Sequence, residues 1–231
     1  MPQTSPAQFR PQLRLTFDDA ADELLGRDAL ALVLGMLLDQ QMPMERAFAG
    51  AYRLATRMGT ATAEPDGTAR PVLSAARIAA AEPAAFEDLC ATPPAVHRFP
   101  RSMAARIQAL CAHVETQWQG DVSRLWATAA SGTELRHRLE ALPGFGPAKA
   151  RIFMALLAKQ RGVAPKGWEA ASHPYGEEGF RSVADVVDRE SLARVRQTKR
   201  AAKASARDSA QSAVTAGSAG GSAESDPPVT P

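Results

Sequence analysis

Apolar residues recur at helical spacing along most of the chain. Asp28 stands where its carboxylate can cap a helix that ends near Asp39 and carries the apolar residues Ala31, Leu32, Leu34, Leu37 and Leu38. Pro43 fits the first turn of a second helix, Met44–Met58, whose apolar residues fall on one side. No window alternates apolar and polar residues over the length of a strand, so no sheet is predicted.

The same helical spacing continues toward the C-terminus, after a polar connection over residues 59–70. Further helices are predicted over Ser74–Ala80, Pro83–Cys90, Ser102–Gln117, Val122–Ala130, Thr133–Ala141, Pro147–Arg161 and Ser191–Arg200. The abundance of alanine, the best helix former, agrees with this pattern. The sequence therefore predicts an all-α fold.

The composition changes after Arg200. From Ala201 to Pro231 alanine, serine and glycine predominate, and there are no aromatic residues. Such a segment cannot bury enough apolar surface to offset the conformational entropy lost on ordering. We expect one helical domain over residues 10–200 and a disordered Ala/Ser/Gly-rich tail over residues 201–231.

The overall composition excludes several classes of protein. With 45% hydrophobic and 23% charged residues the chain can bury an ordinary core. No run of eighteen apolar residues and no leader is present, so we expect no membrane partner and a cytoplasmic protein. Cys90 and Cys111 are too few for a disulfide scaffold or a zinc site, and we expect both to be packing residues. No metal site is predicted. The net charge of +2 is uninformative by itself.

The most specific motif is LPGFG, which lies between two predicted helices. Leu142 and Phe145 can pack inward and hold those helices together, while Gly144 and Gly146 let main-chain N–H groups approach a ligand closely. With the N-terminus of the following helix, these groups form an anion site that suits a DNA phosphate. Lys149, in the first turn of that helix, can add a charge contact. The alternative interpretation is a tight helix–helix turn that binds nothing.

With this motif, the sequence resembles the helix-hairpin-helix (HhH-GPD) superfamily of base-excision DNA glycosylases, typified by endonuclease III. The segment LLDQQ, residues 37–41, resembles the family's segment of two leucines, two variable residues and a glutamine. The segment RFPRSMAARI, residues 98–107, resembles the family's next element, a short loop that leads into a helix. The family's usual glycine and aromatic residue before that helix are not reproduced. The resemblance covers about residues 25–165.

The resemblance implies a bilobal helix-hairpin-helix fold that binds damaged double-stranded DNA as a monomer. Gln41 falls on the glutamine that helps fill the gap left by an extruded base, and residues 144–149 form the hairpin that holds phosphate. Arg98, Arg101 and Arg106 would flank the backbone, although a solvated basic face explains them equally well. The only cofactor left open is a monovalent cation at the hairpin, because the four-cysteine iron–sulfur cluster loop is missing.

The catalytic part of the resemblance is incomplete. Members of the family carry an aspartate eighteen to twenty residues beyond the hairpin, and this chain has Lys166 in that place. Glu169 is the nearest acid, and Glu177, Glu178 and Asp185 follow it. We take Glu169 and Asp185 as the candidate catalytic carboxylates. The family's strand-cleaving lysine corresponds to Ala148 here. Lys149 lies one residue later, a rotation of about 100° along a helix, so AP-lyase activity is not expected.

The sequence therefore favours a DNA-binding protein of base-excision repair, with monofunctional DNA glycosylase activity on damaged or mismatched bases as the leading hypothesis. The alternative is a non-catalytic DNA-binding protein that keeps the scaffold and lacks the catalytic aspartate. A third hypothesis is a protein-interaction module built on the same helices.

Overall fold

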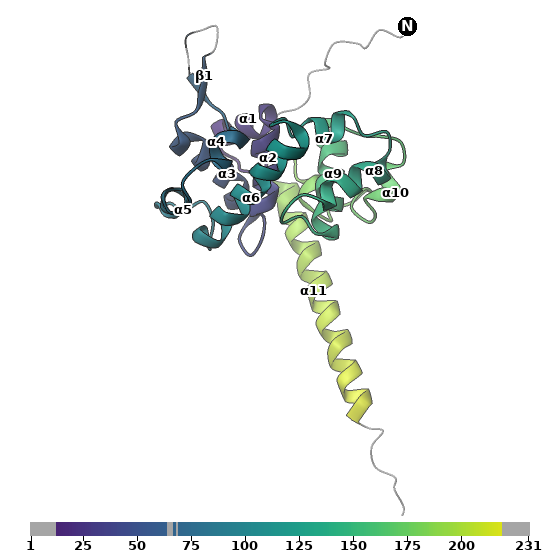
Figure 1. Cartoon of the computed structure of the whole chain (residues 1–231). Helices are drawn as coiled ribbons and strands as arrows, with labels where there is room; N and C mark the ends of the chain where they lie inside the picture. The colour runs from purple at the N-terminus through teal and green to yellow at the C-terminus, as the bar shows by residue number, and fades with distance from the viewer. Residues whose placement is uncertain (1–12, 64–66, 68, 219–231) are drawn as a thin grey trace, which may run out of the picture.

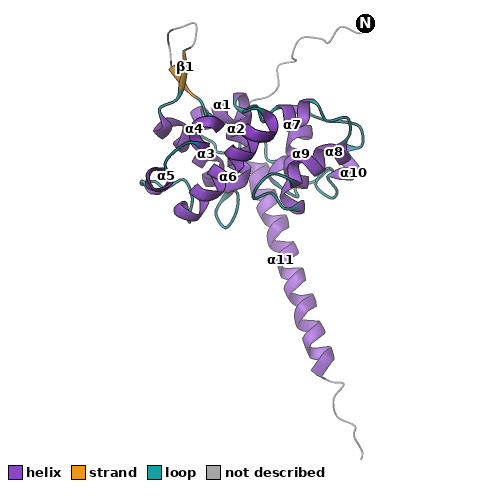
Figure 2. Ribbon diagram, viewed as in Figure 1, coloured by secondary structure: helices purple, strands orange, loops and turns teal. Residues whose placement is uncertain are grey.

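Two groups of helices lie side by side in the protein (Figure 1). The structure, a computed structural model, describes residues 13–63, 67 and 69–218, with residues 208–218 as backbone only. The described part is mostly helical, which confirms the all-α prediction (Figure 2). None of its helices has the length and apolar character needed to cross a membrane.

The first group contains the helices that precede residue 120: α1 (Asp19–Arg27), α2 (Ala29–Leu38), α3 (Met44–Met58), α4 (Ala75–Ala79), α5 (Pro83–Ala91) and α6 (Pro100–Trp118). The second group contains α7 (Arg124–Ala127), α8 (Gly132–Glu140), α9 (Pro147–Arg161), α10 (Trp168–Ala171) and the 3-10 turn η1 (Val183–Asp185). A long helix, α11 (Arg189–Ser218), starts between the groups and extends away from the body (Figure 1). The bounds predicted for α3 and α9 are confirmed.

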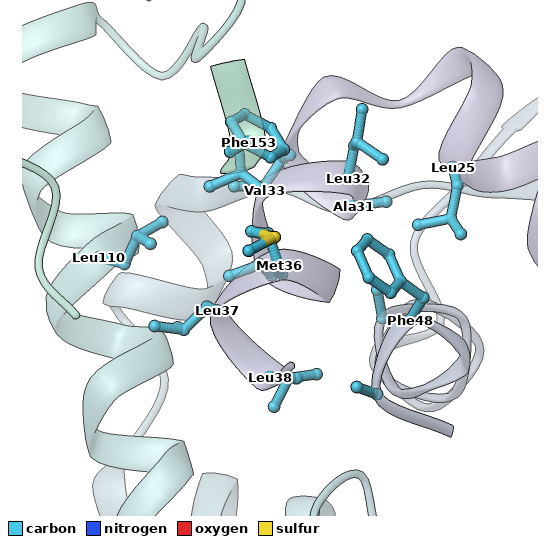
Figure 3. Packing of buried hydrophobic residues seen from close by; sticks show 14 of the residues in the cluster. Leu25, Ala31, Leu32, Val33, Met36, Leu37, Leu38, Phe48, Leu110 and Phe153 are labelled. Carbon is cyan, nitrogen blue, oxygen red and sulfur yellow. The ribbon is translucent and has the colours of Figure 1, made fainter. Parts of the chain in front are cut away.

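Helix α2 is the centre of the core. Every residue from Leu30 to Leu38 is buried, as expected for a helix that is apolar on all sides. Phe48 and Leu25 lie on one side of α2, and Leu110 and Phe153 lie on the other (Figure 3). The Asp28 side chain accepts a hydrogen bond from the N–H of Ala31 at 3.0 Å and so caps the helix, as predicted. Because α2 is enclosed, its ends are held in fixed places.

Both cysteines pack in this core. Cys90 and Cys111 are free and fully buried. Burial in apolar surroundings raises the pKa of the Cys90 thiol to about 12 and also raises the pKa of the Cys111 thiol. Neither thiol is ionised near neutral pH, which leaves both residues unreactive. Their prediction as packing residues is confirmed.

The prediction that the chain has no sheet is wrong. Residues Ala61–Ala63 (β1) and Ala69–Pro71 (β2) pair as a two-stranded antiparallel hairpin. Each strand has only three residues, and β1 is exposed along its whole length. The hairpin therefore buries no apolar face, and without such a face a sequence carries no period-two pattern to detect.

The helix at the C-terminus also differs from the expectation. Disorder was expected from Ala201, but α11 continues through Ser218. Residues 201–207 are exposed, so no tertiary packing accounts for this extension. Its alanines have high intrinsic helix propensity, which allows a helix to continue beyond its anchored first turns. Residues 219–231, and the start of the expected domain at residues 10–12, lie outside the described residues.

The packing of α2 on α3 leads to a prediction about two helical glycines. A Cβ atom at Gly35 would overlap the ring of Phe48, whereas a Cβ atom at Gly26 in α1 would meet nothing within 4 Å. We expect Gly35→Ala to lower the free energy of unfolding by about 1–3 kcal/mol through overpacking. Gly26→Ala is the matched control and should raise it by about 0.5–1 kcal/mol through helix propensity. Urea unfolding of both variants measures the two effects, and equal effects would contradict the close packing at Gly35.

Candidate nucleic-acid interface

The turn between α8 and α9 forms the predicted hairpin. Leu142 and Phe145 point inward and are 2% and 4% exposed, and the Phe145 ring stands edge-on to Phe153 with ring centroids 5.8 Å apart. Gly144 has a φ of 83°, which only glycine adopts readily, and a Cβ atom there would lie 2.5 Å from the Leu37 side chain. The hairpin is therefore pressed against the C-terminal end of α2.

The start of α9 is open to a ligand. Gly146 is the N-cap and provides no side-chain hydrogen bond to the first turn. The N–H groups of Ala148 and Lys149 therefore lack the partner that a capping side chain would supply, while Pro147 has no N–H group. Gly146 and Ala148 are exposed, and a Cβ atom at Gly146 would meet nothing within 4 Å. This geometry suits an anion.

The turn between α2 and α3 lies next to the hairpin. Gln41 is exposed and has a φ of 55°, in the left-handed region that non-glycine residues rarely adopt. Gln40 anchors the turn, because its side-chain amide donates to the Leu37 carbonyl oxygen at 2.8 Å. Backbone strain of this kind is concentrated at functional sites in proteins. The turn presents the Gln41 side chain to solvent, where the sequence places a DNA contact.

Lys149 joins the hairpin to this turn. Its Nζ donates to the Leu37 carbonyl oxygen at 2.8 Å and lies 5.7 Å from the centre of the Phe145 ring. The sequence suggests a phosphate contact for this residue, but the structure directs the amine across to the end of α2. Burial, reinforced by the charge of Arg106 and opposed by that of Asp39, lowers the pKa of Lys149 to about 8.

Asp39 is a residue of this site that sequence reasoning missed. It is the C-cap of α2 and is partly buried, and its carboxylate makes no hydrogen bond within the described residues. Burial raises the pKa of Asp39, while the charges of Lys199 and Lys149 act in the opposite direction. Asp39 belongs to the segment LLDQQ, which the sequence links to the site through Gln41. The resemblance places the catalytic aspartate beyond the hairpin, so Asp39 was not among the candidate acids.

A second loop, which precedes α6, is fixed against the Gln41 turn by His97. The His97 Nε2 atom lies 2.9 Å from the Gln40 carbonyl oxygen, and its Nδ1 accepts from the N–H of Phe99 at 3.0 Å. With Nδ1 as the acceptor, Nε2 can donate to the carbonyl oxygen of Gln40. Phe99 is 46% exposed beside it, and the Arg98 guanidinium lies 5.1 Å from the centre of its ring. The loop therefore presents an exposed aromatic side chain and a cation.

The arginines of α6 have different surroundings. Arg106 donates to the Gln40 side-chain oxygen at 3.2 Å, so it belongs to the site. Arg101 remains 72% exposed, with Glu87 and Asp88 of α5 at 3.9 and 4.0 Å from its guanidinium. The two acids reduce the positive field at Arg101, which makes it the weaker of the two candidates for a phosphate contact.

A cavity of about 450 Å³ opens beside the Gln41 turn. Gln41, Arg46, His97 and Arg98 line it together with Met42, Pro43 and Ala95. A larger hollow of about 730 Å³ lies at the opposite end of α2, where Asp28, Glu115 and Asp121 contribute negative charge. The charge of the smaller cavity is the one that suits an anionic partner.

The structure does not bring the two predicted carboxylates to this site. Asp185 is held in η1, where one oxygen pairs with Lys159 at 2.6 Å and the other accepts from the N–H groups of Arg181 and Ser182. Glu169 is exposed in the first turn of α10, which packs on α8 and α9 in the second group. These contacts engage both carboxylate oxygens of Asp185. Within the described residues, the Glu169 side chain makes no hydrogen bond or ion pair that would orient it.

Metal ligands do not gather in the part of the chain that the structure describes. No group of three or more His, Cys, Asp or Glu side chains there could hold an ion.

Comparison with known proteins identifies the family of the chain. The family model described as "HhH-GPD superfamily base excision DNA repair protein" matches residues 34–214. The matched region includes the Gln41 turn, the loop before α6, the hairpin and most of α11. Searches of curated proteins and of solved structures returned no match.

The shifted pKa of Lys149 predicts how stability depends on pH. Between about pH 8 and pH 10.5 the unfolded chain holds a proton on this amine that the folded chain has released. The free energy of unfolding should therefore rise with pH in this window, relative to a Lys149→Met variant. Urea unfolding at several pH values measures the difference. Lys166→Met, which removes an exposed lysine, should follow the wild type, and a constant difference for Lys149→Met would contradict the shift.

Proposed function

Because the chain belongs to the HhH-GPD superfamily of base excision DNA repair proteins, we propose that it binds damaged or mismatched double-stranded DNA and releases the base as a monofunctional glycosylase. One observation carries the proposal. The hairpin and the Gln41 turn, more than a hundred residues apart in sequence, meet at the Lys149–Leu37 hydrogen bond, and Asp39 lies at this junction.

The open start of α9 supports phosphate binding. Main-chain N–H groups at a helix N-terminus bind a phosphate oxygen without reading the sequence of bases. Such contacts hold the DNA strand in register, so that a neighbouring nucleotide can leave the stack. The hairpin packs rigidly through Phe145, and rigid donors lose little entropy when the phosphate binds.

Two exposed side chains beside the junction, Gln41 and Phe99, are suited to fill the gap that an extruded nucleotide leaves in the duplex. Extrusion of a nucleotide requires side chains that take the place of the missing base and keep the bend. Gln41 is polar and exposed, and Phe99 is a half-exposed aromatic ring on the adjacent loop. His97 holds both loops in one arrangement. Gln41 is the residue that we assign to the gap, with Phe99 as a wedge on its flank.

Asp39 is our candidate for the catalytic carboxylate. In base release the bond between the sugar and the base breaks, and its electron pair leaves with the base. The positive charge that develops on the sugar is stabilised by a nearby carboxylate, and a water molecule then adds to the sugar and loses a proton. Asp39 is partly buried at the junction, so its charge would act in a medium of lower dielectric constant than water.

Monofunctional chemistry is proposed because of the position of Lys149. A lyase requires an amine that attacks the sugar and forms a Schiff base. The Lys149 amine is hydrogen-bonded to the Leu37 carbonyl, so an attack would first have to break this contact. The rival function is a non-catalytic DNA-binding protein, which the exposed Lys166 at the family's aspartate position favours.

Binding is tested at Gly146. Gly146→Leu should weaken binding to a duplex that carries an abasic-site analogue by about 10- to 100-fold, because the new side chain occupies the place of the phosphate. The fold should be unaffected, since the Cβ atom enters open space. Fluorescence anisotropy gives the affinity, and urea unfolding checks the fold. Ala127→Leu, an exposed site in α7, is the control, and an equal effect of both variants would contradict hairpin binding.

Catalysis is tested by single-turnover release of bases from a panel of deaminated, alkylated, oxidised and mismatched duplexes. Asp39→Asn should slow release by about 100-fold or more while binding to the abasic analogue is kept. Glu169→Gln is the matched control and should not change the rate.

The rival functions give different results in the same assay. Absence of release from every duplex, with an intact preference for the abasic analogue, would show a non-catalytic binder. A covalent complex trapped by borohydride would show a lyase. Loss of release in Glu169→Gln but not in Asp39→Asn would contradict our assignment of the carboxylate.

A further inference from the structure

The positive charge of the chain is concentrated in α11. Residues 189–207 hold seven basic residues and one acid, Glu190, whereas the rest of the chain has 20 basic and 24 acidic residues. The net charge of +2 thus hides a strongly basic helix on an otherwise acidic protein. A charge distribution of this kind creates a local field that the net charge does not reveal.

Five of these basic residues lie on one side of the helix. Each has another of them three or four positions away, and all are exposed: Arg196, Lys199, Arg200, Lys203 and Arg207. At 3.6 residues per turn and 1.5 Å per residue, they form a line about 16 Å long. We call this line the basic stripe.

The basic stripe begins at the candidate site. Arg196 forms an ion pair with Glu45, in the first turn of α3, and the charge of Lys199 acts on Asp39. Beyond these residues α11 leaves the body (Figure 1). The stripe therefore continues the positive charge near Asp39 outward along α11.

The base of α11 is firmly attached, which fixes the direction of the stripe. Leu192 and Val195 are buried in the core. The guanidinium groups of Arg189 and Arg194 lie 4.8 and 4.9 Å from the ring centres of Phe17 and Phe180. A helix held in this way carries its distal residues at a defined place relative to the site.

The distal part of α11 has charge and no apolar face. Residues 196–207 are all exposed, and apart from the basic side chains they are alanine, serine, threonine and glutamine. Within the described residues, Arg200, Lys203 and Arg207 have no acidic partner. A protein groove or a membrane would require an apolar stripe. A regular line of cations alone matches the phosphates of a nucleic acid backbone.

We infer that α11 is a DNA-binding arm whose basic stripe contacts phosphates of the duplex that flanks the site. The inference rests on the proposed function, because the occupant is the same DNA. The contacts are independent of base sequence and of damage, so they raise the affinity for any duplex while the hairpin and the Gln41 turn provide the preference for damage.

The test neutralises the distal stripe only. The triple variant Arg200→Gln, Lys203→Gln and Arg207→Gln leaves two residues unchanged: Arg196, which pairs with Glu45, and Lys199, whose charge acts on Asp39. The matched control removes three exposed cations elsewhere: Arg77→Gln in α4, Arg124→Gln in α7 and Lys166→Gln before α10. Glutamine keeps helix propensity, and circular dichroism checks that both variants stay helical.

The measurement is the affinity for an undamaged duplex and for the abasic analogue over a range of salt concentrations. Each phosphate contact contributes about 0.9 to the slope of log affinity against log salt. The stripe variant should thus reduce this slope by about 2–3. At low salt it should lower the affinity for both duplexes by the same factor. The control variant should keep the slope of the wild type.

The outcomes separate the two proposals. A stripe variant with the slope of the wild type, or with the same slope as the control, would overturn the arm even if the preference for the abasic analogue persists. Suppose instead that the wild type binds both duplexes equally and that the stripe variant reduces the slope of log affinity against log salt. This result would support the DNA-binding arm and contradict the repair function. Wild-type protein that binds neither duplex would overturn both proposals.

Discussion

The carboxyl end of α2 is the constraint on which the rest of the structure depends. This helix is buried from Leu30 to Leu38, so its last carbonyl groups require donors from the protein. Gln40 and Lys149 both supply such a donor to the carbonyl oxygen of Leu37. The first donor shapes the turn that presents Gln41, and the second comes from the hairpin in the other group of helices. Hydrogen bonds to the carbonyl oxygen of Leu37 thus join the Gln41 turn and the hairpin, which are distant in sequence, into one site.

This way of building the site sets its electrostatics. The Lys149 amine is drawn into a partly buried position, which lowers its pKa, and Asp39 shares that environment with an opposite shift. Around this junction the surface is positive, through Arg106, Lys199 and the rest of α11, although the chain as a whole is nearly neutral. Positive charge is therefore concentrated at the junction and along one helix, where a phosphate backbone could lie against both.

The helical pattern was largely predictable because it is local. The spacing of apolar residues predicts both a buried helix such as α2 and an amphipathic helix such as α3. The LPGFG motif predicts that Gly144 lies in a turn that needs glycine. The β-hairpin was missed because strands of only three residues, with β1 exposed at every position, leave no period-two pattern. The length of α11 was missed because alanines favour a helix even where no side chains pack against a core. The prediction of disorder considered only how much apolar surface the segment can bury.

The sequence by itself determined the helical class, the hairpin between α8 and α9, the place of Gln41 at a helix end and the packing role of both cysteines. Each of these follows from residues that are neighbours along the chain. The direction of Lys149, the partly buried state of Asp39, the structural use of Asp185 and the continuity of the basic stripe with the site were decided by the tertiary structure. They depend on which distant groups are enclosed together, and burial and charge act through space, where sequence separation carries no information.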